Sequence, residues 1–209
     1  MHAEGELMRI LLVGDSGTIG AAVAELMTSR GHTVIGASRS RVERAVDLTD
    51  AASIDSLYAQ VGTVDAVACA GGHVMYGQIT DMTYDKYRAS LGDKALGQIE
   101  LVRRGLSSIN PRGSFTLITG VLFDRPIVTG SAAAAANGAV EGFARAAALE
   151  LAPIRVNVVS PTLLTESIEK NGHLFPGETP VPAALVANAY LRSIETAETG
   201  QIYRFHPAP

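Results

Sequence analysis

The 209-residue chain has one cysteine, no tryptophan and few charged residues. A single cysteine, Cys69, excludes a framework of internal disulfides and suits a reducing compartment. No apolar run approaches the roughly 20 residues that a membrane-spanning helix needs. The net charge of −4, with lysines and arginines scattered along the chain, gives no reason to propose a nucleic-acid partner. We therefore expect a cytoplasmic protein that contacts neither nucleic acid nor membrane.

The composition indicates a folded chain, because 47% of the residues are hydrophobic and only 18% are charged. We expect one domain over residues 8–209. Residues 1–7, MHAEGEL, are polar and acidic, unlike a signal peptide, and are predicted to form a loose extension. His173 and His206 lie apart without metal-ligand spacing, so we expect no metal.

Residues 9–20, RILLVGDSGTIG, are predicted to form an apolar strand, a glycine turn and the start of a helix. Backbone amides and the helix dipole at such a turn attract an anion, and the three glycines permit close approach of a dinucleotide pyrophosphate. The alternative is an ordinary tight strand–helix connection. The predicted cofactor residues of this turn are Gly14, Ser16, Gly17, Thr18, Ile19 and Gly20.

The next predicted strand, residues 33–37, ends in Ser38 and Arg39 without the acidic residue that would bind an unphosphorylated ribose. A guanidinium there can pair with a 2′-phosphate, which favours NADP(H) over NAD(H). The alternative is that Arg39 and Arg41 are solvated surface residues. We expect the adenosine half to be completed by Asp47, Leu48, Ala70 and Gly71.

Strands and helices alternate along the rest of the chain, which predicts an α/β fold with a doubly wound parallel sheet of about seven strands. The expected strands are residues 10–13, 33–37, 45–48, 64–69, 115–119, 154–159 and 201–205. A long helix is expected over 84–108, ended by residues 111–113, and another over 131–151, capped by Ser131. Pro182 should occupy the first position of the last helix. The loop 162–179 is predicted to form an apolar lid.

Four segments together resemble the short-chain dehydrogenase/reductase family, from residue 8 to the C-terminus: GDSGTIG, ACAGG, NGAVEGFARAAALELAPIRVNVVSPT and TGQIY. The third segment is similar to the family's active-site helix, the strand after it and a proline turn beside the nicotinamide. The resemblance implies a three-layer Rossmann fold, a bound nicotinamide dinucleotide and often a homodimer or homotetramer formed through two long helices. It also implies that Lys94, Thr119, Pro161 and Thr162 surround the nicotinamide half.

The catalytic residues of the family are missing from this chain. The family uses a Tyr-x-x-x-Lys pair, a preceding serine and an asparagine on the earlier long helix. In this chain we assign Ala133 to the tyrosine position, Asn137 to the lysine position, Gly120 to the serine position and Lys94 to the asparagine position. Thr18 also replaces the middle glycine of the usual turn. Because a methyl group cannot transfer a proton, the family's mechanism does not carry over to Ala133.

Lys94 and Asn137 indicate that the family's lysine and asparagine have exchanged positions in this chain. We hypothesise that the Lys94 ammonium supplies its charge to the nicotinamide ribose; the alternative is an ordinary surface lysine. His73 is the first candidate for the proton transfer, because it follows the ACAGG turn and histidine is the residue type suited to proton transfer. The other candidates, with simpler interpretations as a lid residue, a helix cap, a loop hydroxyl and a solvated carboxylate, are Tyr76, Ser131, Thr119 and Glu166.

Three functions fit these residues. The first is an NADP(H)-dependent oxidoreductase that acts on a small carbonyl or alcohol with a non-standard proton relay. The second is a catalytically silent cofactor-binding protein, either a redox sensor or a structural partner in an oligomer. The third is a lyase or isomerase in which the dinucleotide is structural. The sequence predicts no particular substrate.

Overall fold

The computed structural model describes residues 7–205, and its centre is a six-stranded parallel sheet. The strands lie in the order β2-β1-β3-β4-β5-β6, and every neighbouring pair is parallel. Their bounds are β1 Arg9–Val13, β2 Thr33–Ala37, β3 Val64–Cys69, β4 Ile109–Ile118, β5 Arg155–Ser160 and β6 Ile202–Arg204. The strand order reverses between β1 and β3, which is where such sheets bind ligands. The predicted Rossmann-type fold is confirmed.

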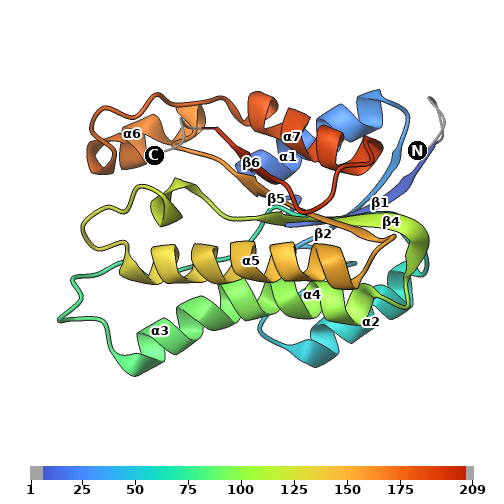
Figure 1. Cartoon of the computed structure of the whole chain (residues 1–209), viewed down its shortest axis with the longest axis horizontal. Coiled ribbons are helices and arrows are strands. Elements are labelled where there is room, and N and C mark those ends of the chain that lie inside the picture. Colours follow the sequence, from blue (N-terminus) through green and yellow to red (C-terminus); the bar gives the residue numbers. More distant parts are fainter. Residues whose placement is uncertain (1–6, 206–209) are drawn as a thin grey trace.

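Helices cover both faces of the sheet and give the molecule three layers (Figure 1). On one face lie α1 and α7, which pack against each other; α2, α4 and α5 cover the other face, with α3 leading into α4. The bounds are α1 Thr18–Ser29, α2 Ala51–Val61, α3 Tyr84–Leu91, α4 Gly97–Gly105, α5 Ser131–Glu150 and α7 Ala183–Glu195. None of the helices in residues 7–205 is long and apolar enough to cross a membrane.

The core follows from this layering. Strands covered on both faces are expected to be apolar throughout rather than alternating. In β1, all residues from Ile10 to Val13 are buried, and β5 is buried along its whole length. The apolar stripe of α2, from Ile54 to Val61, is buried as its spacing predicts, and Asp50 Oδ1 caps this helix by accepting from Ala52 N at 2.9 Å.

The sheet has six strands rather than seven, because residues 45–48 do not form a strand. Arg44 Nε, just before this segment, donates to the Gly36 carbonyl of β2 at 2.9 Å. Asp47 then starts a turn in which its carboxylate accepts from Thr49 N at 2.9 Å. Two long backbone hydrogen bonds of 3.3 Å, from Ser38 N to the Arg44 carbonyl and from Val46 N to the Ser38 carbonyl, also hold the segment, but they do not extend into a strand, and β2 remains the edge strand.

Other boundaries also differ from the sequence predictions. Residues 111–113 lie inside β4 rather than ending a helix. The long helix expected over 84–108 is interrupted by a π-helical turn, Gly92–Leu96. Gly130, not Ser131, is the N-cap of α5, and Pro182 is the N-cap of α7 rather than its first residue. The expected loop 162–179 contains three short helical turns, Thr165–Ser167, α6 (Ile168–Asn171) and Gly172–Leu174.

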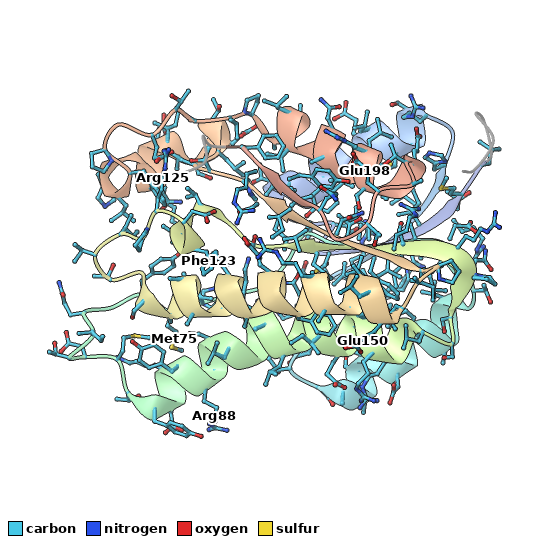
Figure 2. The ribbon with its side chains drawn as sticks, in the orientation of Figure 1. Met75, Arg88, Phe123, Arg125, Glu150 and Glu198 are labelled. Atoms are coloured by element: carbon cyan, nitrogen blue, oxygen red, sulfur yellow. The ribbon has the colours of Figure 1, made fainter. Side chains whose placement is uncertain are left out.

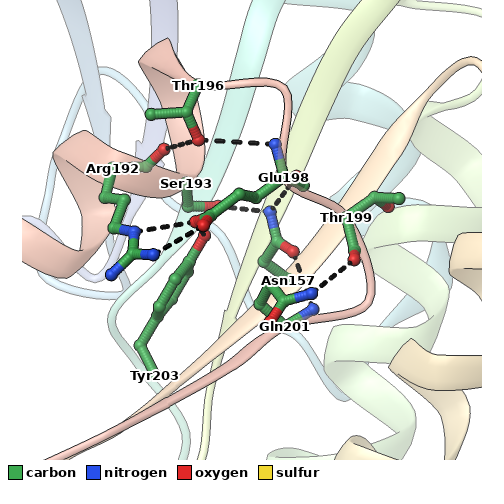
Figure 3. A network of polar contacts seen from close by, with 8 residues as sticks. All are labelled: Asn157, Arg192, Ser193, Thr196, Glu198, Thr199, Gln201 and Tyr203. Carbon is green, nitrogen blue, oxygen red and sulfur yellow. Dashed lines mark hydrogen bonds and ion pairs between the residues drawn. The ribbon is translucent and has the colours of Figure 1, made fainter.

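A polar network fastens the short edge strand β6 to β5 and α7 (Figure 3). Asn157 of β5 donates from Nδ2 to the Glu198 carbonyl at 2.8 Å and accepts from Gln201 N at 2.9 Å. Arg192 of α7 donates to the Glu198 carboxylate at 2.6 and 2.8 Å. These bonds fix the loop before β6 and hence the position of β6 at the sheet edge.

The expected loose extension, residues 1–7, lies outside the described residues except for the exposed Leu7, and so does His206. The division into one domain and an extension stays a prediction.

Candidate functional site

Two cavities lie at the carboxyl edge of the sheet, where loops project from one end of the molecule (Figure 1). The π-helical turn lies between them, since its consecutive residues Asp93 and Lys94 line one cavity each. We name them the glycine-loop cavity and the apolar cavity. Their position at a topological switch point is the usual one for ligands in an α/β sheet.

The glycine-loop cavity, of about 310 Å³, contains most of the predicted cofactor residues. Its lining includes Gly14, Ser16, Gly17, Ser38, Arg39, Asp47, Leu48, Ala70 and Gly71. It also includes Val13, Ser40, Val46, Gly72 and Asp93, which the sequence did not single out. Thr18, Ile19 and Gly20 form the first turn of α1 and do not line the cavity.

The glycine loop has the geometry of an anion cradle. A Cβ on Gly20 would collide with the Gly14 carbonyl, so only glycine lets α1 start this close to β1. A Cβ on Gly17 would find only the Gly14 carbonyl, at 3.5 Å, which leaves space on that side of the loop. Gly17 is the N-cap of α1 and no side chain caps the helix, so its first amides remain available to a bound anion.

The two arginines after β2 have different surroundings. Arg39 lines the cavity, with its side chain 64% exposed, and its Nη1 lies 3.4 Å from Asp93 Oδ2. Arg41 instead pairs at 2.5 Å with Asp15, whose side chain is buried. Of the two guanidinium groups, Arg39 alone is therefore placed to meet a ligand in this cavity.

The apolar cavity, of about 450 Å³, lies beyond the π-helical turn. Its walls are Val74, Tyr76, Val121, Leu122, Ile127, Ala133, Leu163, Leu164, Leu174 and Phe175, with Gly120 and Pro161. The polar residues in the lining are Lys94, Thr119, Asn137, Thr162, Ser167 and Asn171. Lys94 is the single charged residue of this lining.

Local structure directs Lys94 into the cavity. The π-helical turn is held by Gln98, whose Nε2 donates to the Lys94 carbonyl at 2.7 Å and to the Ile118 carbonyl at 2.9 Å. Gln98 Oε1 accepts from Ile118 N at 2.8 Å, so the turn is tied to the end of β4. Gly72 has a φ of +129°, and a Cβ there would lie 2.9 Å from Lys94 Cδ, so any other residue would be strained and would displace the lysine side chain.

The Lys94 ammonium has no hydrogen-bond or ion-pair partner among residues 7–205. Desolvation by burial lowers the pKa of Lys94 below its ordinary value of 10.5, and the charges of Cys69 and Asp93 oppose this only in part. A partly buried, unpaired amine on the turn between two cavities is chemically suited to hold an oxygen atom or to donate a proton to it.

Asn137 and Ala133 lie on the α5 side of the apolar cavity. Asn137 Nδ2 donates to the Gly120 carbonyl at 3.1 Å, while its Oδ1 is buried without a partner. Ala133 presents only a methyl group to the cavity. The three positions assigned to the family's serine, tyrosine and lysine therefore adjoin the same cavity and contain no hydroxyl or amine.

A buried acid supports the floor of the cavity. Glu141 of α5 is 1% exposed and accepts from Thr119 Oγ1 at 3.3 Å and from Arg204 Nη2 at 2.6 Å. Arg204 also pairs with Asp124 at 2.7 Å. This chain of contacts links the cavity lining to β6.

Residues 165–180 form a lid whose ends are fastened. Leu164 and Val181 form a β-bridge at its base. The Glu166 carboxylate accepts from Ala183 N at 2.9 Å and so caps α7. Glu178 accepts from Arg125 at 2.6 Å and from Thr162 Oγ1 at 3.1 Å. Figure 2 shows Arg125 beside the short helices of the lid.

Three side chains predicted to transfer the proton do not line the apolar cavity, and their catalytic role stays a prediction. His73 is exposed and lines a separate groove with Arg88 and Met75, and its backbone N donates to Asp93 Oδ1 at 3.0 Å. Ser131 Oγ is bonded to Tyr87 Oη at 2.7 Å and does not line the apolar cavity. Glu166, as the cap of α7, is also outside the lining.

Cys69 is fully buried, and burial raises the pKa of its thiol to about 11. It is a small core residue, as the sequence indicates. No group of His, Cys, Asp or Glu in the described part of the chain is arranged to hold a metal ion.

Sequence reasoning missed Gln98, Glu141, Arg204 and Glu178. A glutamine or glutamate on the buried face of a helix is a usable signal, because burial without partners is costly. Gln98 and Glu141 could have been noticed in this way. The contacts of Arg204 and Glu178 depend on tertiary structure and leave no local pattern.

Comparisons with known proteins identify the family. A family model described as "Enoyl-(Acyl carrier protein) reductase" matches residues 13–205. "Short-chain dehydrogenase/reductase ATR9" from Stachybotrys chlorohalonatus is 29% identical, with 73% of this chain and 72% of that protein aligned.

Solved structures agree with this assignment. The protein lin1944 from Listeria innocua superposes with a TM-score of 0.93 at 45% identity, covering 95% of this chain and 100% of that one. A small-chain dehydrogenase in complex with NADPH superposes with a TM-score of 0.85 at 25% identity, covering 95% and 96% of the two chains. With the fold, the glycine loop and these matches agreeing, the chain belongs to the short-chain dehydrogenase/reductase family.

Proposed function

We propose that this protein is an NADP(H)-dependent oxidoreductase that interconverts a small carbonyl compound and its alcohol, with Lys94 as the proton-transferring group. The observation that carries the proposal is the unpaired Lys94 ammonium on the turn between the two cavities. The family supports it, since the curated relatives include named reductases.

The glycine-loop cavity fits a dinucleotide, because the first amides of α1 are uncapped and space remains beside Gly17. We propose that Gly14, Ser16 and Gly17 hold the pyrophosphate, and that Ser38 and Arg39 hold the adenosine ribose with its 2′-phosphate. The bound nicotinamide would supply the hydride. The preference for NADP(H) is supported by Arg39 and by the NADPH complex of a relative at 25% identity.

We further propose that the chain lacks the standard Tyr-x-x-x-Lys pair, with Ala133 and Asn137 in those positions. Three hydroxyl groups of the apolar cavity, those of Thr119, Thr162 and Tyr76, are poorly suited to replace the tyrosine. Thr119 and Thr162 donate to the Glu141 and Glu178 carboxylates. Burial raises the pKa of the Tyr76 phenol, which makes it a weaker acid.

Lys94 is then the proton donor in the reducing direction. Its ammonium donates a hydrogen bond to the substrate oxygen, stabilises the negative charge that develops there, and transfers a proton to it. In the oxidising direction the neutral amine accepts the proton of the alcohol. The lowered pKa of Lys94 serves both directions, because it brings the amine closer to neutral pH.

The lining favours a compact substrate with an uncharged, apolar body, since the walls are mainly Val, Leu, Ile and Phe side chains. The silent cofactor-binding alternative is not favoured by the relatives. We also propose a cytoplasmic location, and a homodimer or homotetramer formed through α4 and α5, which size-exclusion chromatography with light scattering would test.

The first experiment is a titration of NADPH and NADH, following the fluorescence of the reduced cofactor. The chain has no tryptophan, so protein emission interferes little. We expect NADPH to bind more tightly than NADH and Lys94→Met to abolish turnover of a panel of small aldehydes and ketones. Absence of binding by either cofactor would overturn the proposal.

A further inference from the structure

An acidic residue reaches the adenosine side of the glycine-loop cavity from an unexpected element. Asp93, in the π-helical turn, places Oδ2 at 3.4 Å from Arg39 Nη1 and Oδ1 at 3.0 Å from the backbone N of His73. Its side chain is 15% exposed, against 64% for Arg39. The carboxylate is therefore fixed, and the guanidinium is the partner that is free to move.

The other charged residues near Arg39 show why its contact with Asp93 matters. Within the lining of the cavity, the charged residues are Arg39, Asp47 and Asp93. Asp47 is occupied by its own turn, because its Oδ1 accepts from Thr49 N at 2.9 Å and from Thr49 Oγ1 at 2.8 Å. Asp93 is thus the carboxylate in direct contact with Arg39, while Asp47 acts on Arg39 only through its charge. No acid follows β2, yet an acid faces the same guanidinium from the opposite side.

We propose that Asp93 is a specificity-determining residue for the cofactor. Before the cofactor binds, Asp93 is the counter-ion of Arg39. The 2′-phosphate of NADP(H) can pair with Arg39 only when the contact between Arg39 and Asp93 is broken. Asp93 also repels the phosphate through its own charge. Both effects oppose NADP(H) and leave NAD(H) nearly unaffected, so the selectivity is smaller than Arg39 alone would give. This inference rests on the proposed function.

The test is Asp93→Asn, with NADPH and NADH dissociation constants measured by cofactor fluorescence. The amide keeps an oxygen that can accept from His73 N, so the loop contact is preserved while the charge is lost. We expect the NADPH-to-NADH affinity ratio to rise about fivefold or more, mainly through NADPH. An unchanged or lower ratio would overturn the proposal. Asp85→Asn is the matched control, because Asp85 pairs with Arg88 on the exposed surface of α3 outside this cavity.

A second variant keeps the proposal testable if Asp93→Asn folds poorly. In Arg39→Gln, the Asp93 carboxylate would face the phosphate without a cation. We expect the preference to reverse in favour of NADH, and a retained preference for NADPH would contradict the proposal. In Arg39→Gln/Asp93→Asn the reversal should disappear, which a purely structural role of Asp93 would not produce.

Failure of this inference can be told from failure of the proposed function. If the wild-type protein binds neither cofactor, the proposed function falls and the inference falls with it. If the wild type binds NADPH and turns over, but the ratio is unchanged in Asp93→Asn, only the role of Asp93 is overturned.

Discussion

Asn137 and Gly120 are joined by a hydrogen bond of 3.1 Å, from the side-chain amide of one to the backbone carbonyl of the other. Under our assignment these are the positions of the family's lysine and serine. The amide of Asn137 is thus used to hold the loop after β4, and it carries no charge. In the function proposed above, a cation for the nicotinamide ribose and a proton for the substrate come from another element, and we propose that Lys94 of the π-helical turn supplies both.

Lys94→Met should lower the rate of carbonyl reduction by about 100- to 10,000-fold, the usual contribution of a general acid. Lys94→Arg is the matched variant, because it keeps the positive charge but donates a proton poorly. We expect Lys94→Arg to bind NADPH and to remain nearly inactive in steady-state assays. If it turned over at the wild-type rate, Lys94 would act through charge alone.

The pH dependence should follow the lowered pKa of Lys94. Reduction needs the protonated amine, so kcat/KM for the carbonyl should fall as pH rises through this pKa. Oxidation of the alcohol needs the neutral amine and should rise over the same range. A pH–rate profile in both directions checks this, and an inflection at or above the ordinary lysine pKa of 10.5 would contradict it.

The same shift predicts a change in stability. Between the lowered pKa and 10.5, the unfolded chain binds more protons at Lys94 than the folded protein does. The free energy of unfolding of the cofactor-free protein should therefore contain a contribution that rises with pH over this window. Comparing urea unfolding of the wild type and Lys94→Met at several pH values isolates it, since the variant should lack this contribution.

The exchange of lysine and asparagine can be tested by reversing it. Lys94→Asn should weaken NADPH binding, and adding Asn137→Lys should restore part of the affinity by returning the ammonium to the α5 side. Asn137→Lys alone places two cations near each other and should not help. A double variant that binds NADPH no better than Lys94→Asn would argue against the exchange.

Glu141→Gln should destabilise the protein by about 1–3 kcal/mol, because the buried contact with Arg204 loses its charge. Glu150→Gln at the exposed end of α5 (Figure 2) is the control and should change the free energy of unfolding by less than roughly 0.5 kcal/mol. Urea unfolding measures both. Equal effects would show that the Thr119–Glu141–Arg204 contacts contribute little.

The lid should loosen when its fastening is removed. Glu178→Ala loses the contacts with Arg125 and Thr162, so we expect KM for the carbonyl to rise about 5- to 10-fold with a smaller change in kcat. Limited proteolysis should cut within 165–180 faster than in the wild type. Glu169→Ala, an exposed residue of α6, should behave like the wild type in both assays.

Much of the fold could be predicted, because strands that are buried on both faces appear in the sequence as continuous apolar runs. Residues 33–37 and 64–69 have the predicted bounds as strands β2 and β3. Residues 45–48 could not be placed, because a short segment near an edge strand can be held by an arginine side chain and two backbone hydrogen bonds without forming a strand. The glycine loop could also be predicted, since the glycine spacing and the strand and helix on either side all lie within one short stretch of the sequence.

The residues of the candidate catalytic site were harder to predict from the sequence. Lys94 was found only through a resemblance, and its approach to the cavity depends on Gln98 and Gly72, which are distant in sequence from β4 and from each other. His73, whose backbone N donates to Asp93 Oδ1, lies outside the lining of the apolar cavity. Such contacts between loops cannot be inferred from periodicity, which reports only the burial of one element.

The π-helical turn sets the rotational phase of the helix around Lys94. Each residue of an α-helix turns the chain by about 100°, so the extra residue in such a turn rotates the helix on its N-terminal side relative to the helix on its C-terminal side. If residues 92–96 were shortened by one residue, α4 would stay packed on the sheet and α3 would rotate about the helix axis. The Lys94 side chain would then no longer point into the cavity. Under the proposed function, helical register as well as residue type thus determines which group can transfer the proton.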